Sequence, residues 1–421
     1  MDRGPANERV QRERVAQLLR ESYRTDLGEV AAFLPARVPV SDLPTVFGPY
    51  LSACAELPAR YPAVRKGVRK WLDRVFARDL PSVRYAIPLL SDGERDAAMT
   101  VLSVLGHAYR WDSMPPAPAR FRERYVTLPP GIAYPWGELA RIYGHPRVGT
   151  TWSLHLCNWK MHDTPSGAAY RPENLTSTNV GVAWNWLLPP SDVHLDRFSI
   201  SFVLLEACGA AALRHLVGAI DATICDCGDV AVREFHDLAS AISTLTRSFS
   251  AHVRKATVDP AVWLELVQPT FPWSAEAEEP GQIEGGPSGM QLGTMQALDA
   301  GLGIGGGSTL AQLARAGRRY MPKPHRRFLR ILDRAGPIVR AQVRQSGDTK
   351  LTEQFDRCVR ALSSFRATHQ ARGTQYLRHC PPGGGARAST GLTIGVNDDA
   401  LLTFDRTMAE RVRETRAATL G

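Results

Sequence analysis

The stretch LTEQFDRCVRALSSFRATHQARGTQYLRH, residues 351–379, decides the fold class. Its apolar residues recur at intervals of four, three, four, three and four positions, the spacing of one face of an α-helix. The residues on this face are Leu351, Phe355, Cys358, Leu362, Phe365 and His369. We predict a long, largely buried helix that is capped by Asp348 or Thr349 and ends before Pro381.

The last residue of this face, His369, stands where leucine would be expected. A neutral imidazole in an apolar seam has two nitrogens to satisfy, and each unsatisfied one costs roughly 1–3 kcal/mol. Arg366 lies on nearly the same face, where a buried guanidinium needs an anion. An iron porphyrin would satisfy both, because its iron takes an imidazole and its propionates bind arginine. A core histidine bonded to a neighbouring side chain is the alternative.

Helical spacing also dominates the rest of the chain, whereas alternating, strand-like runs are scarce. The segments with helical spacing are 9–23, 43–57, 64–76, 92–109, 231–256 and 399–420. We therefore predict an all-α fold. A hinge at residues 189–195 would separate a small N-terminal helical domain, residues 1–188, from a large one, residues 189–421.

Three glycine-rich segments invite interpretation as loops. Residues 280–289 and 381–389 are too rich in glycine and too irregular for a core, so we expect mobile loops over a site. The run LGIGGGS, residues 302–308, follows no predicted strand, which disfavours a nucleotide-binding loop.

Composition narrows the class of protein further. The chain has 421 residues, 44% of them hydrophobic, and no apolar leader at its start, so we expect a globular protein without a secretory signal. The most apolar stretch, residues 200–220, contains Glu206, Arg214 and His215, which favours a buried helix over a membrane span.

Net charge, cysteine spacing and histidine spacing narrow the partners, the redox state and the metal sites that we expect. The net charge of +9 is spread along the helices, so neither nucleic acid nor membrane is expected to bind. The seven cysteines lack CxxC spacing, which predicts free thiols in the cytoplasm. The other histidines form no metal-binding pattern of their own, although ligands from distant helices remain an alternative.

Several motifs resemble those of the indoleamine 2,3-dioxygenase family, from about residue 34 to the last helix. They are RRYMPKPHRRFL at 318–329, GGPSGMQ at 285–291 followed by Asp299, SSFRATHQ at 363–370, LPPGIAYPWGELARIYGHPRV at 128–148 and NWK at 158–160. The resemblance implies an all-helical fold that encloses haem b, with His369 as the iron ligand and Arg366 at a propionate. Asp299, Gly286 and Ser288 would lie on the cofactor side.

In that family, ferrous haem binds O2, and both oxygen atoms enter the indole C2=C3 bond of tryptophan to give a formylkynurenine. We therefore expect a haem-dependent dioxygenase of tryptophan or a tryptophan derivative. The partner is a small indole, and the oligomeric state stays open.

The resemblance also assigns the opposite, distal wall of the pocket. In DRFSISFVLLE, residues 196–206, Phe198 matches a pocket phenylalanine, and Phe202 stands where the family often has a small serine. Ser201 is adjacent and would replace it if the helix were rotated. His155 stands where mammalian-type enzymes have an apolar residue. We predict that it bonds bound oxygen or the indole nitrogen, as the distal histidine of bacterial tryptophan dioxygenases does; a helix-packing histidine is the alternative.

The substrate end of the pocket departs from the family. Gln268 stands near the position of the arginine that binds the substrate carboxylate, and the loss of such a contact costs roughly 1.5–3 kcal/mol. Trp263 and Leu264 replace two phenylalanines, and Thr390 is the best candidate for the substrate's polar end.

These departures keep two further functions open. One is a haem-dependent oxygenase of secondary metabolism, as in the pyrrolnitrin pathway, that acts on a modified indole without ordinary ring cleavage. The other is a haem- or indole-binding sensor.

Overall fold

Helices make up nearly all the regular structure in the computed structural model, which describes residues 5–60, 67–112, 125–273, 275–276, 281–379 and 400–421. Within these residues, the strands form two short antiparallel pairs. β1 (Trp159–Met161) pairs with β2 (Val180–Val182), and β3 (Ala275–Glu276) pairs with β4 (Ile283–Glu284). The all-α prediction is confirmed.

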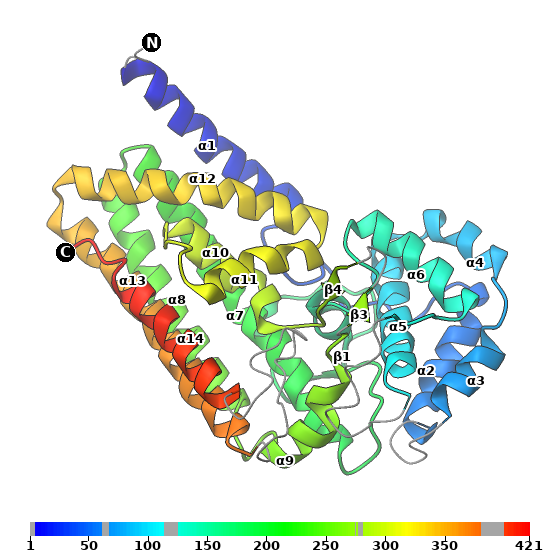
Figure 1. Ribbon diagram of the computed structural model, residues 1–421. Coiled ribbons are helices and arrows are strands. Elements are labelled where there is room, and N and C mark those ends of the chain that lie inside the picture. The colour runs from blue at the N-terminus through cyan, green and yellow to red at the C-terminus, as the bar shows by residue number, and fades with distance from the viewer. Residues whose placement is uncertain (1–4, 61–66, 113–124, 274, 277–280, 380–399) are drawn as a thin grey trace.

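A bundle of long helices forms the larger part of the molecule (Figure 1). It consists of α7 (Asp192–Ile224), α8 (Gly228–His252), α10 (Gly293–Gly301), α11 (Thr309–Gly317), α12 (Lys323–Ser346), α13 (Thr349–Leu377) and α14 (Ala400–Arg416). Its core is built from fully buried residues such as Leu213, Phe235 and Phe355. Removing these apolar side chains from water is the main force that holds the bundle together.

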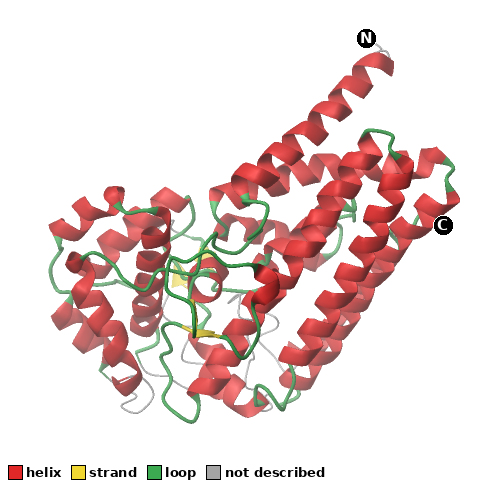
Figure 2. Ribbon diagram, turned by 180° about the vertical axis from the view of Figure 1, so that it is seen from behind, coloured by secondary structure: helices red, strands yellow, loops and turns green. Residues whose placement is uncertain are grey.

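Shorter helices form a second, smaller part beside the bundle (Figure 2). They are α2 (Gly48–Arg60), α3 (Val68–Val75), α4 (Pro81–Ala86), α5 (Asp92–Arg110) and α6 (Pro130–Tyr143). Ser91 and Glu94 form a capping box that fixes the start of α5. Trp136 and Phe76 belong to a core that is separate from the core of the bundle.

A third apolar cluster joins the two parts. It packs Leu156 and Trp159 against Val203 and Leu204 of α7. Leu156 ends a π-helical turn, η4 (Trp152–Leu156). This turn and α7 together form the wall on which the distal residues lie.

The predicted boundary after residue 188 stays a prediction, because two segments pack across it. α1 (Pro5–Asp26) contacts α12 and α7, and its Ala16 and Leu19 belong to the core of the bundle, while its N-terminal end projects outward (Figure 1). In the other direction, Val267 and Phe271 belong to the core of the smaller part.

Two expectations about single segments have opposite outcomes. α7 is long and apolar enough to cross a membrane, but 67% of its most apolar window is buried inside the protein, as predicted for a core helix. The expectation that residues 280–289 lie outside the core is wrong for Gly285, Gly286 and Ser288, which are buried, while the mobility of this loop stays a prediction. Residues 381–389 lie outside the described part of the chain.

Candidate functional site

The predicted histidine helix is α13, and its cap is Asp348. The Asp348 carboxylate accepts hydrogen bonds from the backbone N–H groups of Lys350 and Leu351, at 2.8 and 3.1 Å. The apolar residues of the predicted stripe are buried, whereas His369 at its end is exposed, so the expectation that the imidazole is buried with the stripe is wrong. Its ring lies between Phe249 of α8 and Phe404 of α14, with centroid distances of 5.5 and 6.1 Å.

The state of the His369 ring suits a metal ligand. Desolvation by the surrounding protein lowers its pKa to about 4, so the imidazole is neutral at pH 7. Neither ring nitrogen hydrogen-bonds to a described residue, and the residue is exposed. A neutral imidazole with a free nitrogen is the form that binds iron, so His369 fits the axial position of a haem.

Arg366 has an ionic partner within the chain. It donates to a carboxylate oxygen of Asp299 and to the hydroxyl of Thr415, while Arg411 donates to the other Asp299 oxygen at 2.5 Å. Arg411 also pairs with Glu414, so two guanidinium groups face two carboxylates. Asp299 therefore supplies the anion that sequence reasoning sought for Arg366, and a propionate contact stays a prediction.

The predicted distal residues meet in an aromatic cluster on the wall formed by η4 and α7. The His155 imidazole stacks on the Phe202 ring, with centroids 4.3 Å apart and planes inclined by 13°. Phe271 and Phe198 lie 4.8 and 6.1 Å from the imidazole. The structure thus brings Phe202 against His155, whereas the Ser201 hydroxyl donates to the backbone oxygen of Phe198 at 2.6 Å.

His155 has unused hydrogen-bonding capacity. Its Nδ1 is buried without a hydrogen-bond partner, and the residue is 1% exposed. Burial lowers its pKa to about 3, so the ring is neutral. A buried polar atom without a partner costs roughly 1–3 kcal/mol, and such atoms in native proteins mark strain or function.

A chain of aromatic rings connects this cluster to the helix of His369. Trp263, in the π-helical turn η6 (Trp263–Val267), lies 5.8 Å from Phe198 and 5.5 Å from Tyr376 of α13. The Tyr376 hydroxyl donates to the backbone oxygen of Val258 at 2.8 Å, which fixes its ring. Trp263 Nε1 is buried without a partner.

The other residues expected at the substrate end are placed as follows. Leu264 is partly buried in η6, and Gln268 is buried at the start of η7 (Gln268–Thr270). Thr390 lies outside the described residues.

The glycine-rich motif packs against the distal cluster. A Cβ on Gly286 would lie 1.9 Å from the backbone oxygen of Phe271, so only glycine allows this approach. Ser288 Oγ accepts a hydrogen bond from the Met290 N–H at 3.2 Å. The backbone N–H of Ser288 donates to Thr151 Oγ1 at 2.9 Å.

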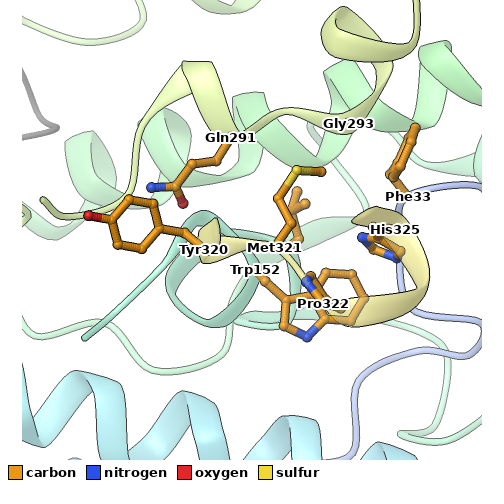
Figure 3. Close-up of a pocket in the computed structure, with 9 residues that line it drawn as sticks. Phe33, Trp152, Gln291, Gly293, Tyr320, Met321, Pro322 and His325 are labelled. Atoms are coloured by element: carbon orange, nitrogen blue, oxygen red, sulfur yellow. The ribbon is translucent and has the colours of Figure 1, made fainter. Parts of the chain in front are cut away.

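A small cavity of about 10 Å³, room for roughly one water molecule, is lined in part by Trp152 and Leu156 of η4 (Figure 3). The His325 ring meets Phe33 and Trp152 edge to face, and burial lowers its pKa to about 3. The other residues that line it are Gln291, Gly293, Tyr320, Met321 and Pro322.

Sequence reasoning missed Phe271, Tyr376, Arg411, Thr151 and Gln291. Each acts through a partner far away in the sequence. The only local signal was the position of Gln291 at the end of the motif GGPSGMQ.

The fold and the two neutral histidines define a mainly helical protein whose candidate site is lined by aromatic rings. The family model for indoleamine 2,3-dioxygenase matches residues 21–379, and the chain belongs to this family.

Similar proteins include two enzymes with that name. Indoleamine 2,3-dioxygenase 2 of Homo sapiens is 25% identical over 76% of this chain and 79% of the relative. Indoleamine 2,3-dioxygenase of Saccharomyces cerevisiae is 27% identical over 82% of this chain and 77% of the relative. A 6-hydroxytryptophan 2,3-dioxygenase of Fusarium equiseti is 25% identical over 85% of this chain and 84% of the relative.

Proposed function

We propose that this protein is a haem-dependent dioxygenase that inserts O2 across the indole C2=C3 bond of tryptophan or a tryptophan derivative, to give a formylkynurenine-type product. The observation that carries the proposal is the neutral His369 imidazole, which lies between the rings of Phe249 and Phe404 and has no hydrogen-bond partner among the described residues. Family membership and the names of the relatives support the same reaction.

His369 would hold the iron of haem b, which supplies the binding and activation of O2. Arg366, with Asp299 behind it, is proposed to face a propionate. Gly286 and Ser288 are proposed to approach the cofactor from the glycine-rich motif.

The chain's own contribution is to orient the substrate and exclude water. Phe198, Phe202 and Trp263 offer flat apolar surfaces, which suit an indole ring. The neutral His155 carries one N–H donor and one acceptor nitrogen, so it can bond the indole N–H or an oxygen atom without introducing a charge.

A second candidate is an oxygenase of secondary metabolism that acts on a modified indole. Two observations favour it. Gln268, which the sequence places near the family's carboxylate-binding arginine, is buried, and Trp263 Nε1 is a buried donor without a partner among the described residues. One relative is named for a hydroxylated tryptophan.

The test is anaerobic reduction of the purified protein, followed by addition of oxygen and tryptophan, with absorbance and product mass measured. We expect a Soret band that is lost in His369→Ala and kept in His236→Ala, a matched control at an exposed histidine of α8. A product heavier by two oxygen atoms supports the dioxygenase. A gain of one oxygen, or turnover only of a substituted or decarboxylated indole, supports the second candidate. A wild-type protein that binds no haem contradicts both.

A further inference from the structure

The turn that carries His155 has an unusual backbone. η4 is π-helical, with the Cys157 N–H donating to the Trp152 oxygen at 2.8 Å. Such wide turns are rare, and they are frequent at functional sites. His155 Nδ1 has no hydrogen bond, so its ring orientation depends on stacking and on how this turn is held.

Thr151, directly before the turn, makes three hydrogen bonds to the glycine-rich motif. Its N–H donates to Gln291 Oε1 at 2.7 Å. Its hydroxyl donates to the Ser288 backbone oxygen and accepts from the Ser288 N–H, both at 2.9 Å. All three residues are at most 5% exposed, so water does not compete for these bonds.

The Gln291 side chain also reaches the second wall around His155. Its Nε2 donates to the Gly286 backbone oxygen at 2.8 Å. Gly286 lies directly against the backbone of Phe271, whose ring is 4.8 Å from the His155 imidazole. One side-chain amide thus links two segments near His155. Its oxygen binds Thr151 at the start of the π-helical turn, and its nitrogen binds Gly286, which lies against the backbone of Phe271. Figure 3 shows Gln291 and Trp152 on the walls of one cavity.

We propose that Gln291 and Thr151 are positioning residues that hold the His155 imidazole flat against Phe202. The glycine-rich motif then acts on the distal wall of the site, in addition to any contact with a cofactor. The inference deepens the proposed function, because His155 matters as a group that faces oxygen or indole.

The test follows the His155 ring by NMR in the full-length chain labelled with ¹³C-histidine, as the haem-free or the diamagnetic carbon monoxide form. A ring stacked on Phe202 experiences its ring current, so the His155 Cε1–H signal lies upfield; His155→Gln identifies the signal, and Phe202→Leu calibrates the ring-current shift. We expect Gln291→Leu and Thr151→Val to move the signal downfield, toward its position in Phe202→Leu. Thr151→Ser, which keeps the hydroxyl, retains the wild-type position.

Gln296→Leu is the matched control. Gln296 is an equally buried glutamine that bonds Met290 and Arg318 instead of the His155 turn. Its replacement leaves the His155 signal in place. Unmoved His155 signals in folded Gln291→Leu and Thr151→Val overturn the proposal, as does an equal shift in Gln296→Leu. The NMR readout needs neither haem nor turnover. The positioning role can therefore be contradicted while the proposed function stands, and the proposed function can be contradicted while the positioning role stands.

Discussion

The His155 imidazole lies parallel to the Phe202 ring at 4.3 Å and makes this contact without any hydrogen bond at Nδ1. Its ring contacts are made by packing against aromatic side chains, and burial keeps it neutral by lowering its pKa to about 3. The unsatisfied nitrogen of His155 therefore reduces the stability of the free protein, which is common where a polar group is kept for function.

The first prediction concerns His155→Leu. The change removes a buried, unsatisfied nitrogen at a gain of roughly 1–3 kcal/mol, but it also loses a ring pair worth roughly 0.5–1.5 kcal/mol. We expect the free energy of unfolding at pH 7 to rise by about 1 kcal/mol, while turnover falls and the oxygen complex decays faster. Urea unfolding and stopped-flow absorbance measure the two effects.

The stability gain in His155→Leu should grow in acid. A histidine whose folded pKa is lowered from 6.5 to about 3 stabilises the fold fully above pH 6.5, and this stability is lost as pH falls toward 3. At pH 5 the wild type should therefore lose about 2 kcal/mol that the variant keeps. A variant that is less stable than the wild type at both pH values contradicts the prediction, and an unchanged oxygen-complex lifetime excludes a distal role.

The helix that carries His369 was predictable because its evidence is local. The spacing that ends at His369 and the cap at Asp348 lie within one helix, and the structure has both. The ionic partner of Arg366 was not predictable in the same way. The sequence indicated that an anion was needed, but that anion, Asp299, comes from another helix, and Arg411 pairs with it from a third. Phe271 and Tyr376 were missed for the same reason.

The glycine-rich motif shows where sequence reasoning failed. Its glycines predicted a loop outside the core, since flexibility and close approach leave the same sequence signature. The structure shows close approach: Gly286 lies against the backbone of Phe271, and Gln291 fixes the segment with hydrogen bonds at both ends of its amide.

The second prediction compares two glycines of this motif. In Gly286→Ala, the new methyl group overlaps the Phe271 backbone oxygen, and overpacking of this kind costs roughly 1–3 kcal/mol. Gly289→Ala is the matched control, because a Cβ there meets nothing within 4 Å. In thermal unfolding, Gly286→Ala should have a clearly lower melting temperature than Gly289→Ala. Equal melting temperatures would show that the motif tolerates movement at Gly286.

The third prediction concerns Glu206, a buried residue of α7 that accepts a hydrogen bond from Thr294 near the start of α10. Burial raises its pKa to about 7, an effect that hydrogen bonds from Thr294 partly offset. A carboxyl whose pKa is raised on folding contributes stability that is complete below pH 4.5 and is lost as pH rises through 7. This loss amounts to roughly 3 kcal/mol.

Replacement of Glu206 by glutamine removes this titration. We expect the difference in unfolding free energy between Glu206→Gln and the wild type to shift in favour of the variant from pH 4.5 to pH 8. Urea unfolding at several pH values measures it, and the comparison cancels the other titrating groups. A difference that does not change with pH would show that Glu206 keeps an ordinary pKa.

The last prediction concerns Gln268→Arg, which returns a cation to the substrate end of the pocket. If Gln268 stands where a substrate carboxylate binds, a bidentate contact should strengthen tryptophan binding by roughly 1.5–3 kcal/mol, about 10- to 150-fold in KM. Steady-state kinetics with tryptophan and with 3-methylindole provide the comparison, because 3-methylindole has no carboxylate to gain from the arginine.

Gln268→Met is the matched control, since it is similar in length and carries no charge. It should leave the preference between the two indoles near the wild-type value, whereas Gln268→Arg shifts the preference toward tryptophan. Equal effects of the arginine on both substrates would place Gln268 away from the carboxylate. If the wild type already prefers tryptophan over 3-methylindole by about 10- to 150-fold, another residue binds the substrate carboxylate. The proposal of a modified indole substrate would then lose its main support.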